Sequence, residues 1–208
     1  MAEGNVGLRS ILKFPSVYDL YQSLVGSRAA RDRIFRTHLP LSERCRLLDI
    51  GCGSGELLEY LPAHVDYTGV DVNPRYIELA RKKYGSHARF ELIDVNNIER
   101  LALPKSSFDV VVLCGVLHHL NDEEVRDVLL FARSMLLEGG VVFTVDGVYL
   151  QGQSWIKKFI LSRDRGAYVR FDQEYEELAR GVFPKVETFV ERNALRIPTD
   201  YFVMRMTK

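Results

Sequence analysis

The chain has 208 residues, of which 47% are hydrophobic, and it carries 28 acidic and 28 basic residues. This length and composition can bury a full core within one domain, which we take as residues 1–208. A formal net charge of +0 disfavours nucleic acid as a partner, because neutralising phosphates requires an excess of Lys and Arg. No stretch has the length of a transmembrane segment and no secretion signal is recognisable, so we expect a cytoplasmic protein.

The first segment with a periodic pattern covers residues 8–42. Tyr18, Leu20, Leu24 and Val25 recur at near-helical spacing, which predicts one or two helices. We expect residues 1–44 to form an N-terminal helical cover. Such helices can lie over a ligand site, or they can cover only an edge of a sheet.

From Arg46 onward, strand-like and helix-like segments alternate, and this alternation predicts a parallel sheet covered by helices. Asn121 and Glu124 are typical of a capping box at a helix start, and Glu138-Gly139-Gly140 should end that helix. The predicted strands are residues 46–50, 66–70, 89–93, 108–113, 141–146, 185–192 and 200–207, and the predicted helices lie near residues 55–61, 74–84, 122–137 and 172–180.

A glycine-rich loop follows the first predicted strand, in the run Leu47-Leu48-Asp49-Ile50-Gly51-Cys52-Gly53-Ser54-Gly55-Glu56. Glycines let the backbone approach a ligand closely and take positive φ, and a helix that opens at Glu56 offers unpaired N–H groups. The loop therefore predicts a site for a nucleotide-like cofactor. A plain tight turn is the alternative.

An acidic residue ends the second predicted strand, Tyr67-Thr68-Gly69-Val70-Asp71. It follows the first glycine by about 20 residues, the spacing at which a βαβ unit places a carboxylate on a ribose, so we expect Asp71 to accept the ribose hydroxyls. The dinucleotide fingerprint requires a third glycine where this chain has Glu56, which disfavours NAD.

The third predicted strand is followed by Asp94-Val95. Together with the glycine loop and Asp71, the order of elements over residues 45–208 resembles that of class I S-adenosylmethionine-dependent methyltransferases. The resemblance implies an α/β fold with a doubly wound, mostly parallel seven-stranded sheet, a terminal antiparallel hairpin, N-terminal helices and a helical insertion after the fifth strand. It also implies S-adenosyl-L-methionine as the cofactor. The implied cofactor-binding residues are Asp49, Gly51, Cys52, Gly53, Gly55, Asp71, Val72, Asp94, Val95 and Cys114.

Some of these residues have expected roles. Asp94 should bind the adenine amine, with Val95 offering its amide. Asp49 should either organise the glycine loop through hydrogen bonds to backbone amides or contact the amino group of the cofactor. The cysteines have no metal-like spacing, so we predict no metal site, and Cys52 and Cys114 should be small fillers rather than nucleophiles.

Two adjacent histidines follow the fourth predicted strand, in the run Cys114-Gly115-Val116-Leu117-His118-His119-Leu120. In the resembling family this exit lies against the methionine moiety and opens toward the methyl acceptor. Histidine suits a general base because its ordinary pKa lies near neutrality. We predict that His118 faces the acceptor and that His119 packs against the next helix. The alternative is a pair whose hydrogen bonds only fasten the loop.

Asp146 and Tyr149 follow the fifth predicted strand at the same edge. Either could orient or deprotonate an acceptor, and each also has an ordinary structural interpretation, as a turn cap and as a half-buried ring.

Residues 147–171 exceed what the sheet requires. Trp155, Ile156, Phe159 and Ile160 share a helical face, and Arg163, Arg165 and Arg170 follow. This pattern predicts a lid with an apolar inner face whose arginines grip an anionic acceptor. A dimer contact, a membrane-surface helix and a lid braced by an internal Arg–Asp pair are alternatives, so the oligomeric state stays open.

The sequence thus predicts a methyltransferase for a small-molecule or lipid-like acceptor, methylated at oxygen, with nitrogen and carbon open. RNA or protein methylation is an alternative. It is disfavoured because the Asn/Asp-Pro-Pro-aromatic signature frequent in such N-methyltransferases does not follow the fourth strand. A catalytically inactive cofactor-binding scaffold is another alternative.

Overall fold

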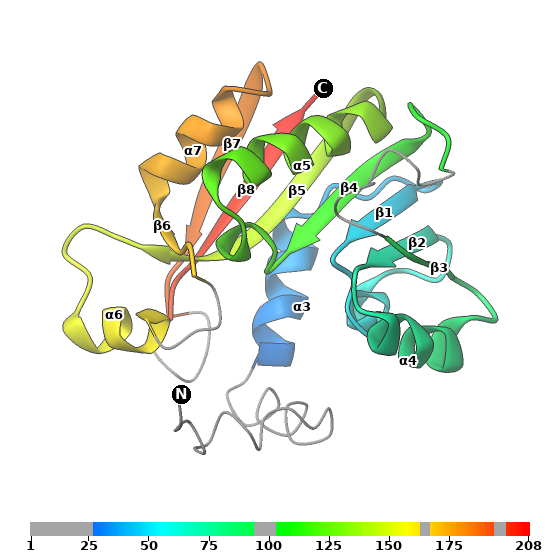
Figure 1. Ribbon diagram of the computed structural model, residues 1–208, viewed down its shortest axis with the longest axis horizontal. Coiled ribbons are helices and arrows are strands. Elements are labelled where there is room, and N and C mark those ends of the chain that lie inside the picture. Colours follow the sequence, from blue (N-terminus) through cyan, green and yellow to red (C-terminus); the bar gives the residue numbers. More distant parts are fainter. Residues whose placement is uncertain (1–26, 94–102, 163–166, 194–198) are drawn as a thin grey trace, which may run out of the picture.

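The computed structural model describes residues 27–93, 103–162, 167–193 and 199–208 (Figure 1). Its sheet has the order β3-β2-β1-β4-β5-β8-β7; β1 to β5 pair in parallel, and β8 is antiparallel to both of its neighbours. The strands are β1 (Arg46–Ile50), β2 (Asp66–Asp71), β3 (Arg89–Leu92), β4 (Phe108–Cys114), β5 (Leu136–Tyr149), β7 (Lys185–Glu191) and β8 (Tyr201–Thr207), with a short β6 (Arg170–Phe171) beside the end of β5. The predicted doubly wound sheet and its terminal hairpin are confirmed.

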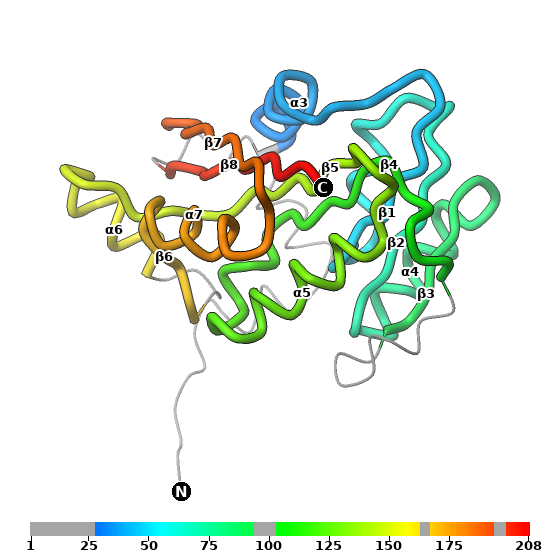
Figure 2. Tube along the Cα trace, turned by 90° about the horizontal axis from the view of Figure 1, so that it is seen from above, coloured from blue at the N-terminus to red at the C-terminus, as the bar shows by residue number. Residues whose placement is uncertain are grey.

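Helices cover both faces of this sheet. Figure 2 shows α3 on one side and α5 and α7 on the other. Buried side chains of α5 and α7 form one core cluster with the sheet, whereas those of α3 and α4 belong to a second cluster. The helices are α3 (Ser27–His38), α4 (Pro74–Tyr84), α5 (Asp122–Met135), α6 (Trp155–Ser162) and α7 (Asp172–Arg180), and two single 3-10 turns are η1 (Glu56–Tyr60) and η3 (Leu117–His119).

The described part of the predicted N-terminal cover is α3, which packs into the core. Ile34 is 2% exposed, and the ring of Phe35 lies 6.1 Å from that of Phe143 on β5. This helix therefore covers a face of the sheet. The remainder of the predicted helical segment, residues 8–26, lies outside the described residues.

Two of the predicted helices differ from those in the structure. The helix predicted near residues 55–61 is the 3-10 turn η1, because Gly55 at its start is left-handed (φ 83°) and an extended Leu61 follows it. The helix predicted to end at Glu138-Gly139-Gly140 ends at Met135, where the fully buried Leu136 begins β5. The pairing then shifts from Phe108↔Leu136 to Val110↔Val141, so the glycines lie in a bulge of β5 instead of a helix cap.

The predicted insertion after the fifth strand contains α6. Residues 147–149 continue β5 and residues 170–171 form β6, so α6 stands at the end of the sheet beyond β5. Among the helices that the structure describes, none is long and apolar enough to cross a membrane.

Candidate active site

The glycine loop lies at the carboxyl end of β1, next to the exit of β4. The strand order reverses between these two strands, which is where open α/β sheets bind ligands. Gly51 is left-handed, and a Cβ there would stand 2.7 Å from Val116 of the β4 exit. Gly53 is also left-handed (φ 54°), but in the described part of the chain no atom beyond its chain neighbours lies within 4 Å of the position of its Cβ. Packing therefore requires glycine at position 51, whereas the space above Gly53 is open to a ligand.

Asp71 fixes this loop. Its side chain is buried at the end of β2, with Oδ2 accepting the amide of Gly53 at 2.9 Å and Oδ1 accepting the amide of Asn73 at 2.8 Å. Each carboxylate oxygen keeps further acceptor capacity, so Asp71 can bind the ribose hydroxyls while it holds the loop.

Asp49 has a different partner from the one we expected. Its Oδ2 accepts the hydroxyl of Tyr67 at 2.6 Å, and the hydrogen bond to the amide of the glycine loop belongs to Asp71. The prediction that Asp49 organises the loop amides is therefore wrong for the described residues, because its carboxylate binds Tyr67 and Asp71, at the end of the neighbouring strand, binds the loop. Contact with the amino group of the cofactor stays a prediction.

Burial raises the pKa of Asp49 to about 7, and the nearby Asp71 adds to the rise while the bond from Tyr67 opposes it. The folded protein therefore holds the Asp49 proton to higher pH than the unfolded chain, whose pKa is near 3.8. Its contribution to stability is lost as pH rises from about 4 to about 7. We expect Asp49→Asn, which keeps an acceptor for Tyr67, to stabilise the unliganded protein at pH 8 by up to ~4 kcal/mol and to change little at pH 4. Urea unfolding at both pH values measures this; equal effects at both would contradict it.

His118 forms a buried pair with Asp146. The Nδ1 of His118 lies 2.8 Å from Oδ1 of Asp146, which also accepts the backbone amide of His118 at 3.2 Å. His118 is 7% exposed and Asp146 is 2% exposed. Because a carboxylate accepts, this bond places the proton of the neutral imidazole on Nδ1 and leaves the lone pair on Nε2. The arrangement can hold a histidine in the tautomer that a general base needs.

His119 does not pack inward as predicted. It is exposed, and its ring lies 4.2 Å from that of His118. The reason is that the turn η3 directs only His118 inward, toward Asp146 of β5, so that His119 faces outward.

Cys52 and Cys114 are weakly reactive. Burial raises the pKa of the Cys52 thiol far above its usual range and that of Cys114 to about 12, so both stay protonated near neutral pH. Cys114 ends β4, where Arg31, Asp49 and Asp146 all act on it electrostatically. Val72, directly after Asp71, is 53% exposed at the same edge, and its contact with the cofactor stays a prediction. Asp94 and Val95 lie outside the described residues.

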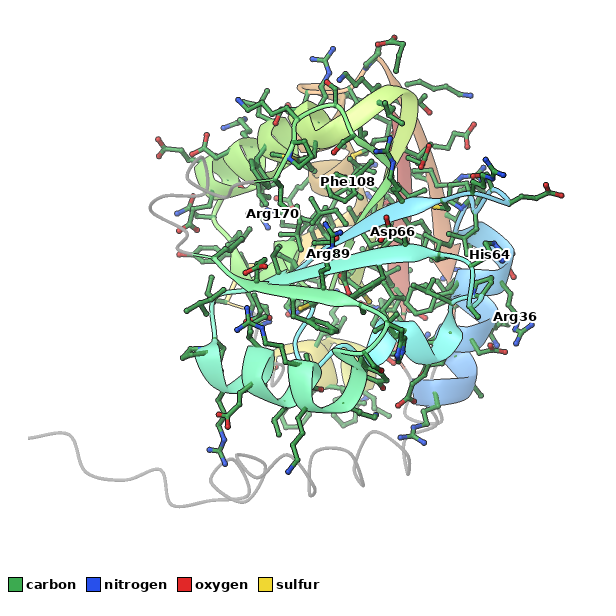
Figure 3. The ribbon with its side chains drawn as sticks, turned by 90° about the vertical axis from the view of Figure 1, so that its right-hand side faces the viewer. Arg36, His64, Asp66, Arg89, Phe108 and Arg170 are labelled. Carbon is green, nitrogen blue, oxygen red and sulfur yellow. The ribbon has the colours of Figure 1, made fainter. Side chains whose placement is uncertain are left out.

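Arg170 forms an internal Arg–Asp pair, the alternative to an arginine that grips the acceptor. Its buried guanidinium, labelled in Figure 3, donates to Asp122 at 2.7 Å and to the carbonyls of Leu117 and Leu120. The amide of Tyr168 donates to the carbonyl of His118 at 2.9 Å. The segment around β6 therefore fastens the histidine loop, and Arg170 has no donors to spare. Arg163 and Arg165 lie outside the described residues.

Sequence reasoning missed Arg31 of α3. Its Nη1 lies 2.7 Å from Glu56, which directly follows the glycine loop. No local signal indicates this contact, because only the tertiary packing of α3 against η1 brings the two residues together.

A doubly wound sheet with a glycine loop and a strand-end carboxylate at the reversal of strand order defines a fold of the Rossmann-like, nucleotide-cofactor class. Residues 48–142 match the family model described as a methyltransferase domain. The fold resembles a SAM-dependent methyltransferase from Archaeoglobus fulgidus (TM-score 0.71, 18% identity, 92% of this chain and 99% of that one). Residues 48–142 are thus similar to a methyltransferase domain, and the fold is the class I fold that the sequence predicted.

Curated relatives carry the same family name. The chain is 30% identical over 116 residues to an uncharacterized methyltransferase of Mycobacterium tuberculosis (55% of this chain, 56% of that protein). It is 30% identical over 141 residues to a malonyl-[acyl-carrier protein] O-methyltransferase of Paenibacillus sp. (62% of this chain, 50% of that protein). The matches span about half the length of these relatives.

Proposed function

We propose that the protein transfers a methyl group from S-adenosyl-L-methionine to a hydroxyl oxygen of a small or lipophilic acceptor. The observation that carries this proposal is that two structural features lie at the same edge of the sheet. One is the glycine loop, which Asp71 holds and which is open above Gly53, and the other is the His118–Asp146 pair. The methyltransferase family of the matched domain supports the same activity.

The glycine loop and the carboxylates beside it fit the cofactor. The Gly53 loop offers close backbone approach, Asp71 accepts the ribose hydroxyls, and Asp49 lies on β1 as a carboxylate for the cationic amino group. When bound, the cofactor supplies an electrophilic methyl group on its sulfonium. The protein excludes water and holds the acceptor in line, and positioning of this kind lowers barriers by several kcal/mol.

The His118–Asp146 pair removes the hydroxyl proton of the acceptor. Nε2 of His118 accepts the hydroxyl proton as the acceptor oxygen becomes methylated, and the ring becomes an imidazolium. Asp146 stabilises that cation through Nδ1–H and fixes the ring orientation. Its Oδ2 is buried and has no hydrogen-bond partner in the described part of the chain, which leaves it available to a bound group or a water.

Methyl transfer itself is tested with cofactor labelled in the methyl group. The purified protein is incubated with extracts of small molecules and lipids, and labelled products are identified by mass spectrometry. We expect labelled methyl ethers or esters. Label only in RNA or protein would contradict the acceptor class, and no label with any extract, despite cofactor binding, would favour an inactive scaffold.

Asp71→Asn should weaken cofactor binding by ~1.5–3 kcal/mol, because a neutral amide loses the charge-assisted bonds to the ribose and cannot accept both loop amides. The control is Asp66→Asn, since Asp66 is exposed at the opposite end of the same strand. Calorimetric titration with S-adenosylhomocysteine compares the two variants. Equal affinity in both would remove Asp71 from the site.

A further inference from the structure

Helix α6 presents apolar side chains to solvent and directs a charge inward. Trp155 is 76% exposed, Ile156 45% and Phe159 53%, whereas the side chain of Lys157 is 14% exposed. Soluble helices normally show the opposite arrangement, and clustered exposed apolar residues mark a binding surface.

A buried ion pair enforces this orientation. The Nζ of Lys157 lies 2.7 Å from Oδ1 and 2.9 Å from Oδ2 of Asp200, which is 1% exposed. Gln153 and the amide of Asn193 complete the partners of that carboxylate. Burial opposes ionisation of Asp200, but these partners together hold its pKa below its usual range. Turning α6 to bury Trp155 would leave this charge without compensation, which is strongly unfavourable.

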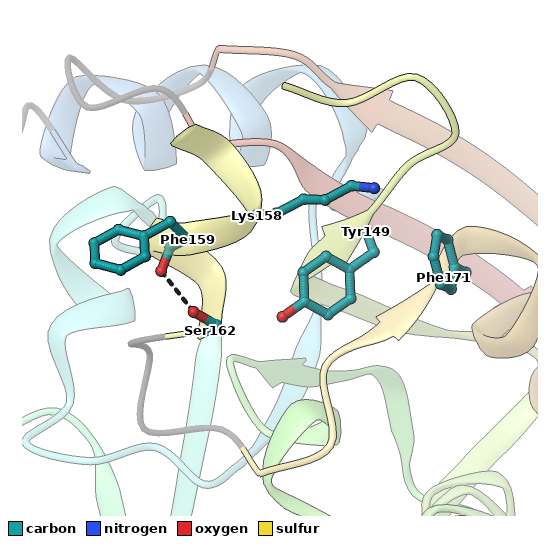
Figure 4. Close-up of a pocket in the computed structure, with 5 residues that line it drawn as sticks. All are labelled: Tyr149, Lys158, Phe159, Ser162 and Phe171. Atoms are coloured by element: carbon teal, nitrogen blue, oxygen red, sulfur yellow. Dashed lines mark hydrogen bonds between the residues drawn. The ribbon is translucent and has the colours of Figure 1, made fainter. Parts of the chain in front are cut away.

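Helix α6 borders an open cavity of about 430 Å³, lined by Tyr149, Lys158, Phe159, Ser162 and Phe171 (Figure 4). The hydroxyl of Ser162 donates to the carbonyl of Phe159 at 2.8 Å, so it is already engaged. Aromatic rings dominate the remaining lining, with the rings of Tyr149 and Phe171 5.8 Å apart. A cavity of this size and character fits an alkyl chain.

Lys158 gives this cavity its charge. Residues 150–162 contain no Asp or Glu, and Lys157 is neutralised by Asp200. Among the residues that the structure describes, Lys158 has no acidic partner, and Figure 4 shows its side chain running alongside Tyr149. A ligand with an anionic group complements this cation.

The cavity and the candidate active site share the elements β5 and β6. Tyr149 lies three residues beyond Asp146 on β5, and Phe171 lies on β6, directly after the arginine that holds the carbonyls of Leu117 and Leu120. A ligand bound between Tyr149 and Phe171 therefore rests on the elements that position His118.

We propose that this cavity binds a single-chain anionic amphiphile, with its alkyl chain between Tyr149, Phe159 and Phe171 and its anionic group at Lys158. The inference rests on the proposed function only where it makes this amphiphile the methyl acceptor; binding itself does not require the cofactor.

The probes are laurate, dodecyltrimethylammonium and butyrate, each below its micellar concentration. Trp155 is the single tryptophan of the chain, so its emission reports on α6, and calorimetry gives the affinities. We expect laurate to saturate one site and to shift the emission to shorter wavelength, with dodecyltrimethylammonium and butyrate at least tenfold weaker. Laurate that leaves both signals unchanged, or binding of the two 12-carbon probes with equal affinity, would overturn the proposal.

Substitutions distinguish the contribution of the ligand's charge from that of its alkyl chain. Lys158→Glu should weaken laurate by about tenfold and reverse the preference toward dodecyltrimethylammonium, while Lys82→Glu, at an exposed position of α4, should change neither. Phe159→Ser should weaken both 12-carbon probes alike. No effect of Lys158→Glu would contradict the anion site. Binding to phosphatidylglycerol vesicles without binding of monomeric laurate would overturn the pocket in favour of a membrane surface.

S-adenosylhomocysteine is titrated into the same samples. If it binds and laurate does not, this inference fails and the proposed function stands. If laurate binds and S-adenosylhomocysteine does not, the methyltransferase proposal fails and the amphiphile site stands.

Discussion

His118→Ala should lower turnover by about 10²–10⁴-fold while leaving the affinity for S-adenosylhomocysteine nearly unchanged, because positioned proton transfer contributes that factor and the ring is not part of the cofactor cradle. Asp146→Asn should also lower turnover, since an amide at this position can donate to Nδ1 and favour the tautomer whose lone pair faces Asp146. Turnover, cofactor affinity and melting temperature are measured for each variant.

The control is His119→Ala, because His119 is exposed and adjacent to His118. We expect it to retain near-normal turnover. If His118→Ala instead loses stability and cofactor affinity together, with turnover falling only in proportion, the pair merely fastens the loop. Near-normal turnover in His118→Ala would remove it as the base, and that result is expected for an acceptor atom that carries no proton to remove.

Gly53→Val should abolish cofactor binding. The valine side chain would fill the space above the loop that the described residues leave open, where the cofactor approaches the backbone. The left-handed backbone at Gly53 also strains any residue with a Cβ, by about 1–2 kcal/mol. A loss of binding must therefore be separated from a loss of folding.

Gly139→Val is the matched control. Gly139 is likewise left-handed (φ 75°) and exposed, and no atom of the other described residues lies within 4 Å of its Cβ position. It lies at the start of β5, away from the carboxyl edge. Both variants should lose similar stability in urea, and only Gly53→Val should lose binding of S-adenosylhomocysteine in calorimetry. Wild-type affinity in a folded Gly53→Val protein would exclude the loop as the cradle.

Local patterns predicted the order of the strands well, and some element ends coincide with a feature visible in the sequence. Asp71 ends β2, and Asn121 with Glu124 forms the predicted capping box at the start of α5. The end of α5 was not predictable in this way. Leu136 continues the apolar pattern of the helix, and only its pairing with Phe108 shows that the chain has already entered the sheet.

The site was predicted in its composition and less well in its contacts. The sequence placed the glycine loop, Asp71 and His118 at one edge, because parallel strands all end there. It did not show that Asp71 holds the loop amide in place of Asp49, nor that Asp146 pairs with His118 across 28 residues. It left Arg170 open between a ligand and an internal carboxylate, which is Asp122. It did not show the pair of Lys157 and Asp200, since a charged residue beside an apolar helical face is normally exposed.

The central claim is that the edge formed by β1, β2 and β4 is a cofactor site specific for S-adenosyl-L-methionine. Calorimetric titration of the full chain with S-adenosyl-L-methionine, S-adenosylhomocysteine and NAD tests it most directly. We predict one saturable site for each of the first two ligands and none for NAD, because Glu56 stands where a pyrophosphate would need glycine. Tight binding of NAD, or binding of none of the three by the folded protein, would contradict the account.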